Sequence, residues 1–427
     1  MTNGSGVEPA AHGATYHSLD GLVTLVELSR EIGVHSDLDT LLRRVEAAAL
    51  HILDCERLTV FVSEPLANIL RSRLATGGHE IRIPADQGIV GATFRNNHII
   101  NVADAPADPR FYDAIDRQTG FRTRSLLSVP LRGIDNEAIG VLELLNKRDG
   151  VFTADDEELA LTLGSLTGIT LQRQILFEHY REKQRLEHEL QLARNIQQSL
   201  LPVSLPQIPG FDIVAWTQAA DATGGDFYDF LDLPDGRIGL VVADVAGHGL
   251  AASLLACETR ALIRAAAVST ASIVEIAMRT NALLHRDLHN ERFVVLFLAA
   301  LEPTTGRLEF VSAGCAPIVY RQSESRFIPA EASVPPLGVL PSVHGCIATE
   351  LTLRSGDIVA MPTDGLYEWE NDKRREFGLE RLGESLRCHA HRPAAELIRG
   401  LREDVLDHAG GVPQADDLTA MVIKRVP

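Results

Sequence analysis

Apolar residues recur with a helical period near the start of the chain. Between Leu19 and Leu53 they fall every three or four residues in two successive runs, and Asp37 stands where it could cap the second run. Three short apolar runs bounded by turn residues then predict strands at Leu58–Val62, Ser125–Val129 and Ala138–Leu145. This order predicts an α+β domain with an antiparallel sheet and flanking helices.

Two further helices complete this half of the chain. A short helix is expected after the tight turn at Gly88–Gly91, and a long one from the capping-box start at Thr153 to about Gln174. The segment from Phe177 to Leu200 is also helical and strongly charged, and Pro202 ends it. A short heptad seam runs along it through Leu186, Leu190, Ala193, Gln197 and Leu200. Two interpretations remain open: packing on its own domain, or a parallel coiled coil between two copies.

The pattern changes again near Ile208, where many β-type runs follow one another. Helical periods separate them at Leu250–Ala267, Ile273–Leu284 and Ala394–His408. The predicted strands are Phe211–Trp216, Ile238–Ala243, Phe293–Leu301, Leu308–Val311, Ile318–Tyr320, Ile358–Met361 and Ala420–Lys424. Strands with paired helices between them predict a sheet sandwich covered by helices on both sides.

Length, charge and cysteine content narrow the class of protein. The 427 residues allow two to three domains, and the net charge of -18 argues against nucleic acid or an anionic membrane as a partner. Five scattered cysteines form no zinc or disulfide pattern. Residues 1–15 are interpreted as a disordered tail without signal-peptide character, and no apolar run is long enough to cross a bilayer. A cytoplasmic location is therefore expected.

Acidic residues in turn contexts carry the candidate chemistry of the second half. Asp226 follows two glycines, Asp244 and Asp364 each follow an apolar strand, and Asp416 stands beside Asp417. Any one of them could be an ordinary turn former or helix cap. Together they form an oxygen-only donor set, which favours Mg²⁺ or Mn²⁺ over zinc. Two such cations can activate a bridging water and neutralise phosphate oxygens, so the pattern predicts hydrolysis of a phosphate monoester.

These motifs resemble the metal-dependent protein phosphatases of the PPM, or protein phosphatase 2C, superfamily, specifically the SpoIIE-type branch. The resemblance runs from about residue 190 to 427 and implies an α/β/β/α sandwich, two Mn²⁺ or Mg²⁺ ions and a serine/threonine phosphatase. It also implies a phosphorylated anti-sigma-factor antagonist as substrate in a partner-switching pathway. The matching motifs are Gly-Gly-Asp226-Phe-Tyr-Asp, Asp244-Val-Ala-Gly-His-Gly, Pro336-Leu-Gly, Thr-Asp364-Gly and Asp416-Asp-Leu-Thr.

The resemblance assigns a role to each acid. Asp244 would bridge both metals together with the Val245 carbonyl, while Asp226 and Asp364 would each hold a metal or its waters. Asp416 matches the last acidic ligand, with Asp417 beside it as the alternative.

Three details of the second half allow a different interpretation. His248 could be a general acid for the leaving oxygen, or could make only a supporting hydrogen bond. Cys315 replaces a histidine that is common in the family, which leaves the phosphate site in doubt. The Gly-Gly-Asp-Phe stretch is similar to a diguanylate cyclase signature but lacks that signature's next acidic residue.

Residues 16–175 resemble a GAF domain. The segment on which this resemblance rests ends in an Asn-Lys pair, a Phe and an Asp-Glu pair, and it is similar to a signature of GAF domains that bind cyclic nucleotides. The residues are Asn146, Lys147, Phe152, Asp156 and Glu157. An interpretation in which Lys147 and Asp156 pin a loop to a helix explains the same residues by folding alone.

The predicted organisation is a tail at 1–15, a GAF sensor domain at 16–175, a helical linker at 176–205 and a phosphatase domain at 206–427. A homodimer through the linker and the GAF domain is expected. The alternative function is a non-catalytic scaffold whose degenerate phosphatase fold sequesters a partner, but such a protein should have lost Asp244 or Asp364, and this chain keeps both.

Overall fold

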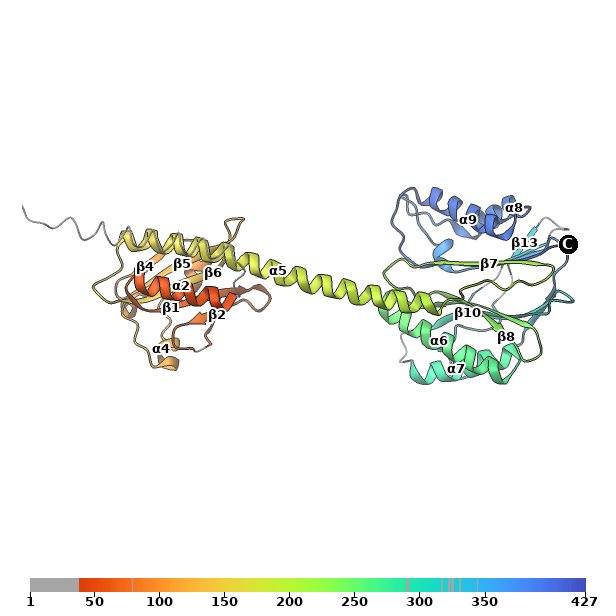
Figure 1. Ribbon diagram of the computed structural model, residues 1–427, viewed down its shortest axis with the longest axis horizontal. Coiled ribbons are helices and arrows are strands. Elements are labelled where there is room, and N and C mark those ends of the chain that lie inside the picture. Colours follow the sequence, from red (N-terminus) through yellow and green to blue (C-terminus); the bar gives the residue numbers. More distant parts are fainter. Residues whose placement is uncertain are drawn as a thin grey trace, which may run out of the picture. The chain divides into compact units, whose positions relative to one another are not determined.

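The computed structural model describes residues 38–78, 80–288, 292–315, 318–321, 323, 326–329, 332–343 and 345–427. The predicted tail and the first of the two predicted N-terminal helical runs lie outside these residues. By its internal contacts the chain divides into two compact units, Met1–Gln184 and Arg185–Pro427. Each unit contains its own sheet structure, and helix α5 (Ala154–Leu200) belongs to both (Figure 1).

One antiparallel sheet of six strands forms the centre of the N-terminal unit. Its strand order is β3-β2-β1-β6-β5-β4. The elements are α2 (Leu38–Ile52), β1 (Cys55–Glu64), η1 (Pro65–Ala67), β2 (Ile69–Ala75), β3 (Arg82–Pro84), α3 (Gly88–Asn96), β4 (Ile100–Val102), η2 (Ala105–Ala107), α4 (Ala114–Thr119), β5 (Leu126–Arg132) and β6 (Ala138–Lys147).

The two faces of this sheet have separate cores. Alternate residues of each central strand point to opposite faces, so Leu142 and Leu144 of β6 pack with α2 and the start of α5. Val141 lies on the other face and packs with α3 through Val90. Glu143 shares that second face, where the alternation would otherwise place an apolar residue. The α+β architecture expected from the sequence is confirmed.

Helix α5 is a single element, whereas the sequence patterns suggested separate helices on either side of residue 175. The helix continues without a break because no glycine or proline occurs between Ile169 and Leu201. Buried side chains end at Leu171, and beyond it the helix carries charged residues on most faces. A helix of this length requires support beyond its own propensity, since most helical stability in proteins comes from packing.

Two five-stranded antiparallel sheets make up the C-terminal unit, with strand orders β14-β11-β10-β9-β8 and β13-β12-β15-β16-β7. The strands are β7 (Phe211–Gln218), β8 (Phe227–Asp232), β9 (Ile238–Val245), β10 (Val294–Leu301), β11 (Arg307–Ala313), β12 (Ile318–Arg321), β13 (Arg326–Pro329), β14 (Thr349–Thr352), β15 (Ile358–Pro362) and β16 (Leu418–Arg425). The helical elements are α6 (Leu250–Ser269), α7 (Ile273–Asp287), η3 (Asp364–Leu366), α8 (Gly378–His389) and α9 (Ala394–Ala409).

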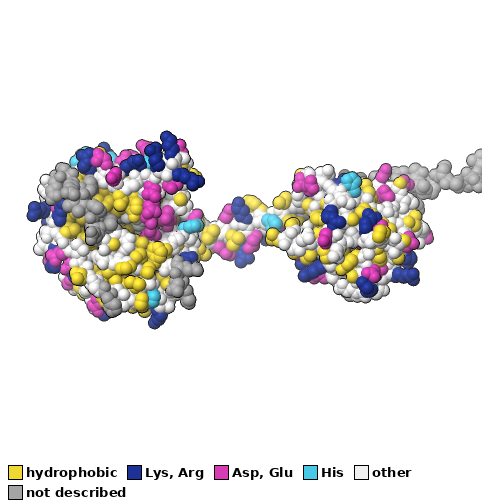
Figure 2. Space-filling view, turned by 180° about the vertical axis from the view of Figure 1, so that it is seen from behind, with side chains coloured by type: hydrophobic (Ala, Val, Ile, Leu, Met, Phe, Trp, Pro, Cys, Tyr) yellow, Lys and Arg dark blue, Asp and Glu magenta, His cyan; other side chains and the backbone are white. Residues whose placement is uncertain are grey.

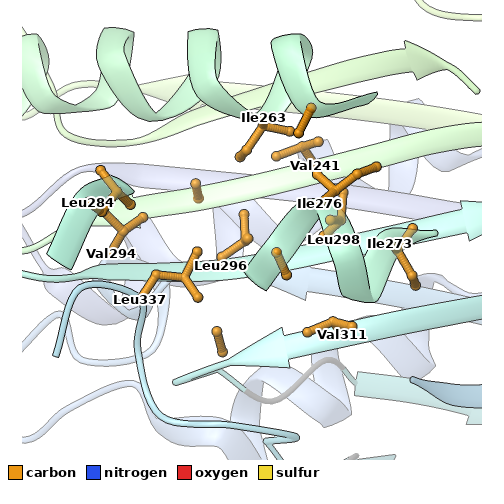
Figure 3. Packing of buried hydrophobic residues seen from close by; sticks show 14 of the residues in the cluster. Val241, Ile263, Ile273, Ile276, Leu284, Val294, Leu296, Leu298, Val311 and Leu337 are labelled. Carbon is orange, nitrogen blue, oxygen red and sulfur yellow. The ribbon is translucent and has the colours of Figure 1, made fainter. Parts of the chain in front are cut away.

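The hydrophobic clusters show that these elements form four layers. Helices α6 and α7 cover the outer face of the first sheet, where Ile263 and Ile276 pack on Val241 and Leu298 (Figure 3). A second cluster joins the inner faces of the two sheets. A third packs α8 and α9 on the outer face of the second sheet through Leu397 and its neighbours. This is the α/β/β/α sandwich that the resemblance implied.

Some elements were not predicted from the sequence. Strand β8 begins directly after Asp226, in a stretch that was interpreted as a turn. Helix α8 was not predicted either, although Leu379, Leu382 and Leu386 recur along it at helical spacing. Within the described residues, no helix combines the length and the apolar character needed to cross a lipid bilayer.

Candidate functional site

Asp244 lies near the end of the central strand β9, opposite Val295 of β10. The apolar run before it is buried on both faces, which fixes the direction of its carboxylate. A pocket begins here and extends between the two sheets, lined by Asp244 and Asp364 together with Cys315 and Tyr367. The pocket therefore lies between a residue of the first sheet and the turn that follows strand β15 of the second sheet.

The turn after β15 brings Asp364 to this pocket. Thr363 precedes it, and the Thr363 hydroxyl donates a 2.7 Å hydrogen bond to a carboxylate oxygen of Asp226. Gly365 follows it, and any side chain there would strike the backbone carbonyl of Asp417. The glycine is thus required because three loops from distant parts of the sequence approach one another closely.

Asp226 is held beside Asp244 by a glycine pair. Its side chain is buried, with 6% of its surface exposed. A β-carbon on Gly225 would lie 2.7 Å from the Val245 carbonyl oxygen, and one on Gly224 would lie 2.5 Å from the Asp417 carboxylate. Glycine at both positions is what lets the backbone before Asp226 pass this close to its neighbours.

The two adjacent aspartates just before β16 differ in their surroundings. Asp417 is 3% exposed, and its carboxylate accepts backbone N–H hydrogen bonds from Ala220 at 2.8 Å, Gly225 at 2.5 Å and Asp226 at 3.3 Å. Asp416 is exposed. The buried carboxylate is therefore already used to hold the loop, whereas the Asp416 carboxylate accepts a single backbone hydrogen bond, from the Asp417 N–H at 2.8 Å, and is the better candidate ligand.

Burial and mutual repulsion perturb these carboxyl groups. Burial first, and then the neighbouring Asp364 and Asp416 carboxylates, raise the pKa of Asp244 to about 7. The pKa of Asp226 is also raised, by burial and then by Asp244 and Asp417. Burial likewise raises the pKa of Asp416. In the absence of a cation, adjacent buried carboxylates hold protons that they would otherwise lose at neutral pH.

Among the described residues, no arginine or lysine forms an ion pair with these four carboxylates, and only His248 partly offsets the charge of Asp416. None of the ion pairs among the described residues involves Asp226, Asp244, Asp364 or Asp416. By contrast Asp229, on the following strand, is paired with Arg260 at 3.0 Å and Arg264 at 2.6 Å. Asp229 thus has cationic partners, whereas the four candidate metal ligands form no ion pair within the described part of the chain.

The donor chemistry fits a divalent cation. Carboxylate oxygens are the preferred ligands of Mg²⁺ and Mn²⁺, and a cation would relieve the repulsion that raises the pKa values. In the described part of the chain, however, no three His, Cys, Asp or Glu side chains are close enough together to hold one metal ion as they stand. The ligands are gathered at one place, but they do not surround a common point.

His248 lies on the exposed loop after β9. Its Nδ1 atom is 2.9 Å from a carboxylate oxygen of Asp221, which also is exposed. A carboxylate on Nδ1 fixes the tautomer of the ring and leaves Nε2 for a proton donor role. Asp221 was not singled out from the sequence, because it lies outside the acidic motifs; its contact with His248 spans 27 residues.

The residues of the GAF-type signature hold the N-terminal unit together. Lys147 forms a largely buried ion pair with Asp156 at 2.8 Å, and Asp156 also accepts the backbone N–H of Thr153 at 2.9 Å. Phe152 is in the core, and Glu157 accepts a hydrogen bond from Asn101.

Asn146 completes this set of contacts. It is fully buried, accepts the Arg124 N–H at 2.7 Å and donates to the Arg122 carbonyl at 3.0 Å and to Glu56 at 2.8 Å. None of the five signature residues lines the cavity of this unit. Their contacts agree with the interpretation in which these residues stabilise the fold of the domain.

A cavity of about 50 Å³, partly open to solvent, lies instead between the sheet and the segment that contains α3 and α4. Aromatic residues line it, and the guanidinium of Arg57 stacks 3.9 Å from the centre of the Phe121 ring. Glu143 of β6 faces it, and none of the hydrogen bonds or ion pairs among the described residues involves the Glu143 side chain. Burial first, and then Asp116, raise the pKa of Glu143 to about 7.

Comparison with known proteins identifies both halves. Residues 37–171 match the family model of the GAF domain, and residues 234–426 match that of Stage II sporulation protein E (SpoIIE). The chain therefore contains a GAF domain followed by a SpoIIE-family domain with a PP2C-type fold, as the sequence motifs indicated.

Individual relatives agree with this division. The chain is 26% identical over 266 residues to Protein IcfG of Synechocystis sp., a match that covers 56% of this chain and 41% of that protein. It is 25% identical over 246 residues to phosphoserine phosphatase RsbU of Bacillus subtilis, a match that covers 57% of this chain and 72% of that protein. The SiaA-PP2C domain of Pseudomonas aeruginosa has a similar fold, with 22% identity, a TM-score of 0.51 and coverage of 57% of this chain and 98% of that one.

Proposed function

We propose that the chain is a Mg²⁺- or Mn²⁺-dependent phosphatase that acts on phosphoserine or phosphothreonine in a protein. The observation that carries this proposal is the set of four carboxylates, Asp226, Asp244, Asp364 and Asp416, none of which forms an ion pair with another described residue. Burial raises the pKa values of Asp226, Asp244 and Asp416. The matches to the SpoIIE family and to a phosphoserine phosphatase support the same reaction.

Each residue has a role in this reaction. Asp244 and the Val245 carbonyl would hold both cations, and Asp226, Asp364 and Asp416 would hold one each or its waters. Two bound cations would lower the pKa of a coordinated water and neutralise the phosphate oxygens.

On the leaving-group side, His248 is the proposed proton donor to the serine or threonine oxygen. Its ring is oriented by Asp221, which accepts a hydrogen bond from Nδ1 at 2.9 Å when that nitrogen carries the proton. Cys315 lines the pocket beside Asp244, and burial raises the pKa of its thiol to about 11. The thiol therefore stays protonated at neutral pH and is proposed to shape the phosphate site rather than react.

The substrate we propose is a phosphorylated anti-sigma-factor antagonist, so that the protein acts in a partner-switching pathway in the cytoplasm. The similarity to RsbU supports this substrate class. The GAF domain would be the sensor, with its cavity rather than the Asn146 motif as the ligand site. Cyclic AMP and cyclic GMP are the first ligands to test there, because the signature resembles that of cyclic-nucleotide-binding GAF domains.

We also propose that α5 pairs with its copy in a homodimer. Four leucines on it are exposed, Leu176 by 54%, Leu186 by 52%, Leu190 by 37% and Leu192 by 49%. Between the two units the helix presents hydrophobic side chains among charged ones (Figure 2). Large apolar side chains at heptad spacing are stabilised when a second helix covers them.

The test is phosphate release from a phosphoserine protein and from p-nitrophenyl phosphate, with Mn²⁺, with Mg²⁺ and with EDTA. We expect turnover that requires the metal and falls at least a hundredfold in Asp244→Asn. Asp372→Asn, which removes an exposed carboxylate in the same unit, is the matched control and should behave as wild type. Turnover that survives EDTA, or that Asp244→Asn leaves intact, would contradict the proposed metal site.

A further inference from the structure

Tyr367 follows the turn that carries Asp364 and lines the same pocket. Its backbone is held on both sides, because its N–H donates to the Asp364 carbonyl at 2.9 Å and its own carbonyl accepts the Gly378 N–H at 2.7 Å. The ring is half-buried and packs against the hydrophobic cluster between the second sheet and helices α8 and α9. Both the backbone and the ring of Tyr367 are therefore fixed beside the pocket.

The hydroxyl group of Tyr367 has no partner in the part of the chain that the structure describes. None of the hydrogen bonds among those residues involves it. Burial first, and then the Asp364 and Glu368 carboxylates, raise the pKa of Tyr367, with smaller contributions from Cys315 and Asp244. The phenol therefore keeps its proton at neutral pH, and a protonated phenol can donate a hydrogen bond.

Other strong side-chain donors are lacking at this pocket. None of the described residues that line it is an arginine, a lysine or a histidine. The Thr363 hydroxyl lines it too, but it already donates to the Asp226 carboxylate at 2.7 Å. The Cys315 thiol is a weak donor and lies 3.5 Å from the Ser312 hydroxyl. Among the side chains that line the pocket, the phenol of Tyr367 is thus the strong donor that is still available.

A phosphate group bound here would need such a donor. It carries three acceptor oxygens and a negative charge, which the carboxylates of Asp244 and Asp364 repel. Active sites that bind phosphoryl groups stabilise this charge with cations and with fixed donors such as arginine, lysine or tyrosine. Since no arginine or lysine lines the pocket, the Tyr367 hydroxyl is the group that this chain offers beside the metal ligands.

We propose that Tyr367 is a catalytic residue that contacts the substrate: its hydroxyl donates a hydrogen bond to a non-bridging oxygen of the phosphate group. This inference rests on the function proposed above. The ring also lines a second, more open pocket of about 430 Å³ together with Glu368 and Leu379. Tyr367 therefore lies between the candidate metal site and a surface that a protein substrate can reach.

One variant and one control isolate the hydroxyl from the ring. Tyr367→Phe removes the hydroxyl and keeps the ring that packs in the cluster. Tyr320→Phe removes a phenol hydroxyl from the same hydrophobic cluster, at a position that does not line the pocket, and should behave as wild type. The variants are made in the full-length protein.

The first readout is kcat/KM with Mn²⁺ for two substrates, a phosphoserine protein and p-nitrophenyl phosphate. Tyr367→Phe should lower it about 10–100-fold for both, because hydrogen bonds to charged groups have this effect and both substrates present the same oxygens. A proton donor to the leaving oxygen would behave differently, since p-nitrophenolate leaves without a proton whereas serine requires one.

The second readout is binding rather than turnover. Calorimetric titration of the Mn²⁺-loaded protein with inorganic phosphate should show affinity weakened about tenfold in Tyr367→Phe and unchanged in Tyr320→Phe. The affinity for Mn²⁺ and the thermal midpoint of unfolding should equal those of the wild type, because the phenylalanine ring preserves the packing.

The outcomes separate this inference from the proposed function. Wild-type kcat/KM and phosphate affinity in Tyr367→Phe would overturn the role of Tyr367 and leave the phosphatase proposal standing. A loss confined to the phosphoserine protein would make Tyr367 a proton donor, and a weakened Mn²⁺ affinity or a lowered midpoint would make its role structural; either result also overturns the inference. A wild-type protein without Mn²⁺-dependent turnover would overturn the proposed function, and the inference with it.

Discussion

Glu143 makes the stability of the GAF domain depend on pH in a way that can be calculated. Its carboxyl group lies on the cavity face of the central strand β6, and burial with a contribution from Asp116 raises its pKa from 4.5 to about 7. The folded state therefore binds the proton more tightly than the unfolded state. Stability is fully retained below about pH 4.5 and is lost as the pH rises through 7.

The size of the effect follows from the pKa change. A difference of about 2.5 pKa units at 1.36 kcal/mol each gives a limiting loss of about 3 kcal/mol at high pH. At pH 5 the same relation gives a loss of about 1 kcal/mol, so about 2–3 kcal/mol should disappear between pH 5 and pH 8. Glu143→Gln cannot ionise and should abolish this component while preserving the shape of the side chain.

The measurement is the free energy of opening of the β6 amides by hydrogen exchange, corrected for the intrinsic effect of pH, because this reports on the N-terminal unit alone. The opening free energy of Glu143→Gln minus that of wild type should increase by about 2–3 kcal/mol between pH 5 and pH 8. Glu137→Gln, which removes an exposed carboxylate just before the same strand, should show no such difference. If this difference between Glu143→Gln and wild type changed by less than about 0.5 kcal/mol between pH 5 and pH 8, the reasoning would be refuted.

Three further substitutions test other parts of the structure. Lys147→Met leaves the buried Asp156 carboxylate without its cation and should lower the free energy of unfolding of the GAF domain by about 3 kcal/mol in chemical denaturation; an unchanged midpoint would contradict the structural role of the pair. Leu186→Glu places a charge on the exposed seam of α5 and should convert a dimer into a monomer in analytical ultracentrifugation, and a wild-type protein that is already monomeric would refute the dimer. Asp417→Ala leaves three N–H groups without an acceptor and should lower stability by about 2–3 kcal/mol, whereas Asp416→Ala should weaken Mn²⁺ binding at nearly unchanged stability; the reverse result would exchange the two roles.

Several features could be predicted from the sequence because they depend on local pattern. The apolar run before Asp244 predicted a buried strand with the carboxylate near its end, and β9 has that form. The fold class was predicted correctly in both halves for the same reason: alternation and helical periodicity reflect which face of an element is buried. The division of α5 into two helices was wrong, because a change in burial along a helix was taken for a break in it.

What the sequence by itself determined is the set of elements and the acidic motifs near their ends, since both are encoded in residues that are neighbours along the chain. Only the tertiary structure decided what those residues do to one another. It bound the Asp417 carboxylate to a loop almost two hundred residues away in the sequence and paired Gln197 with Gly224. It also placed Glu143 at a cavity, where no side-chain hydrogen bond or ion pair joins it to another described residue. Such contacts follow from how the layers pack, and packing brings together side chains whose separation in the sequence carries no signal.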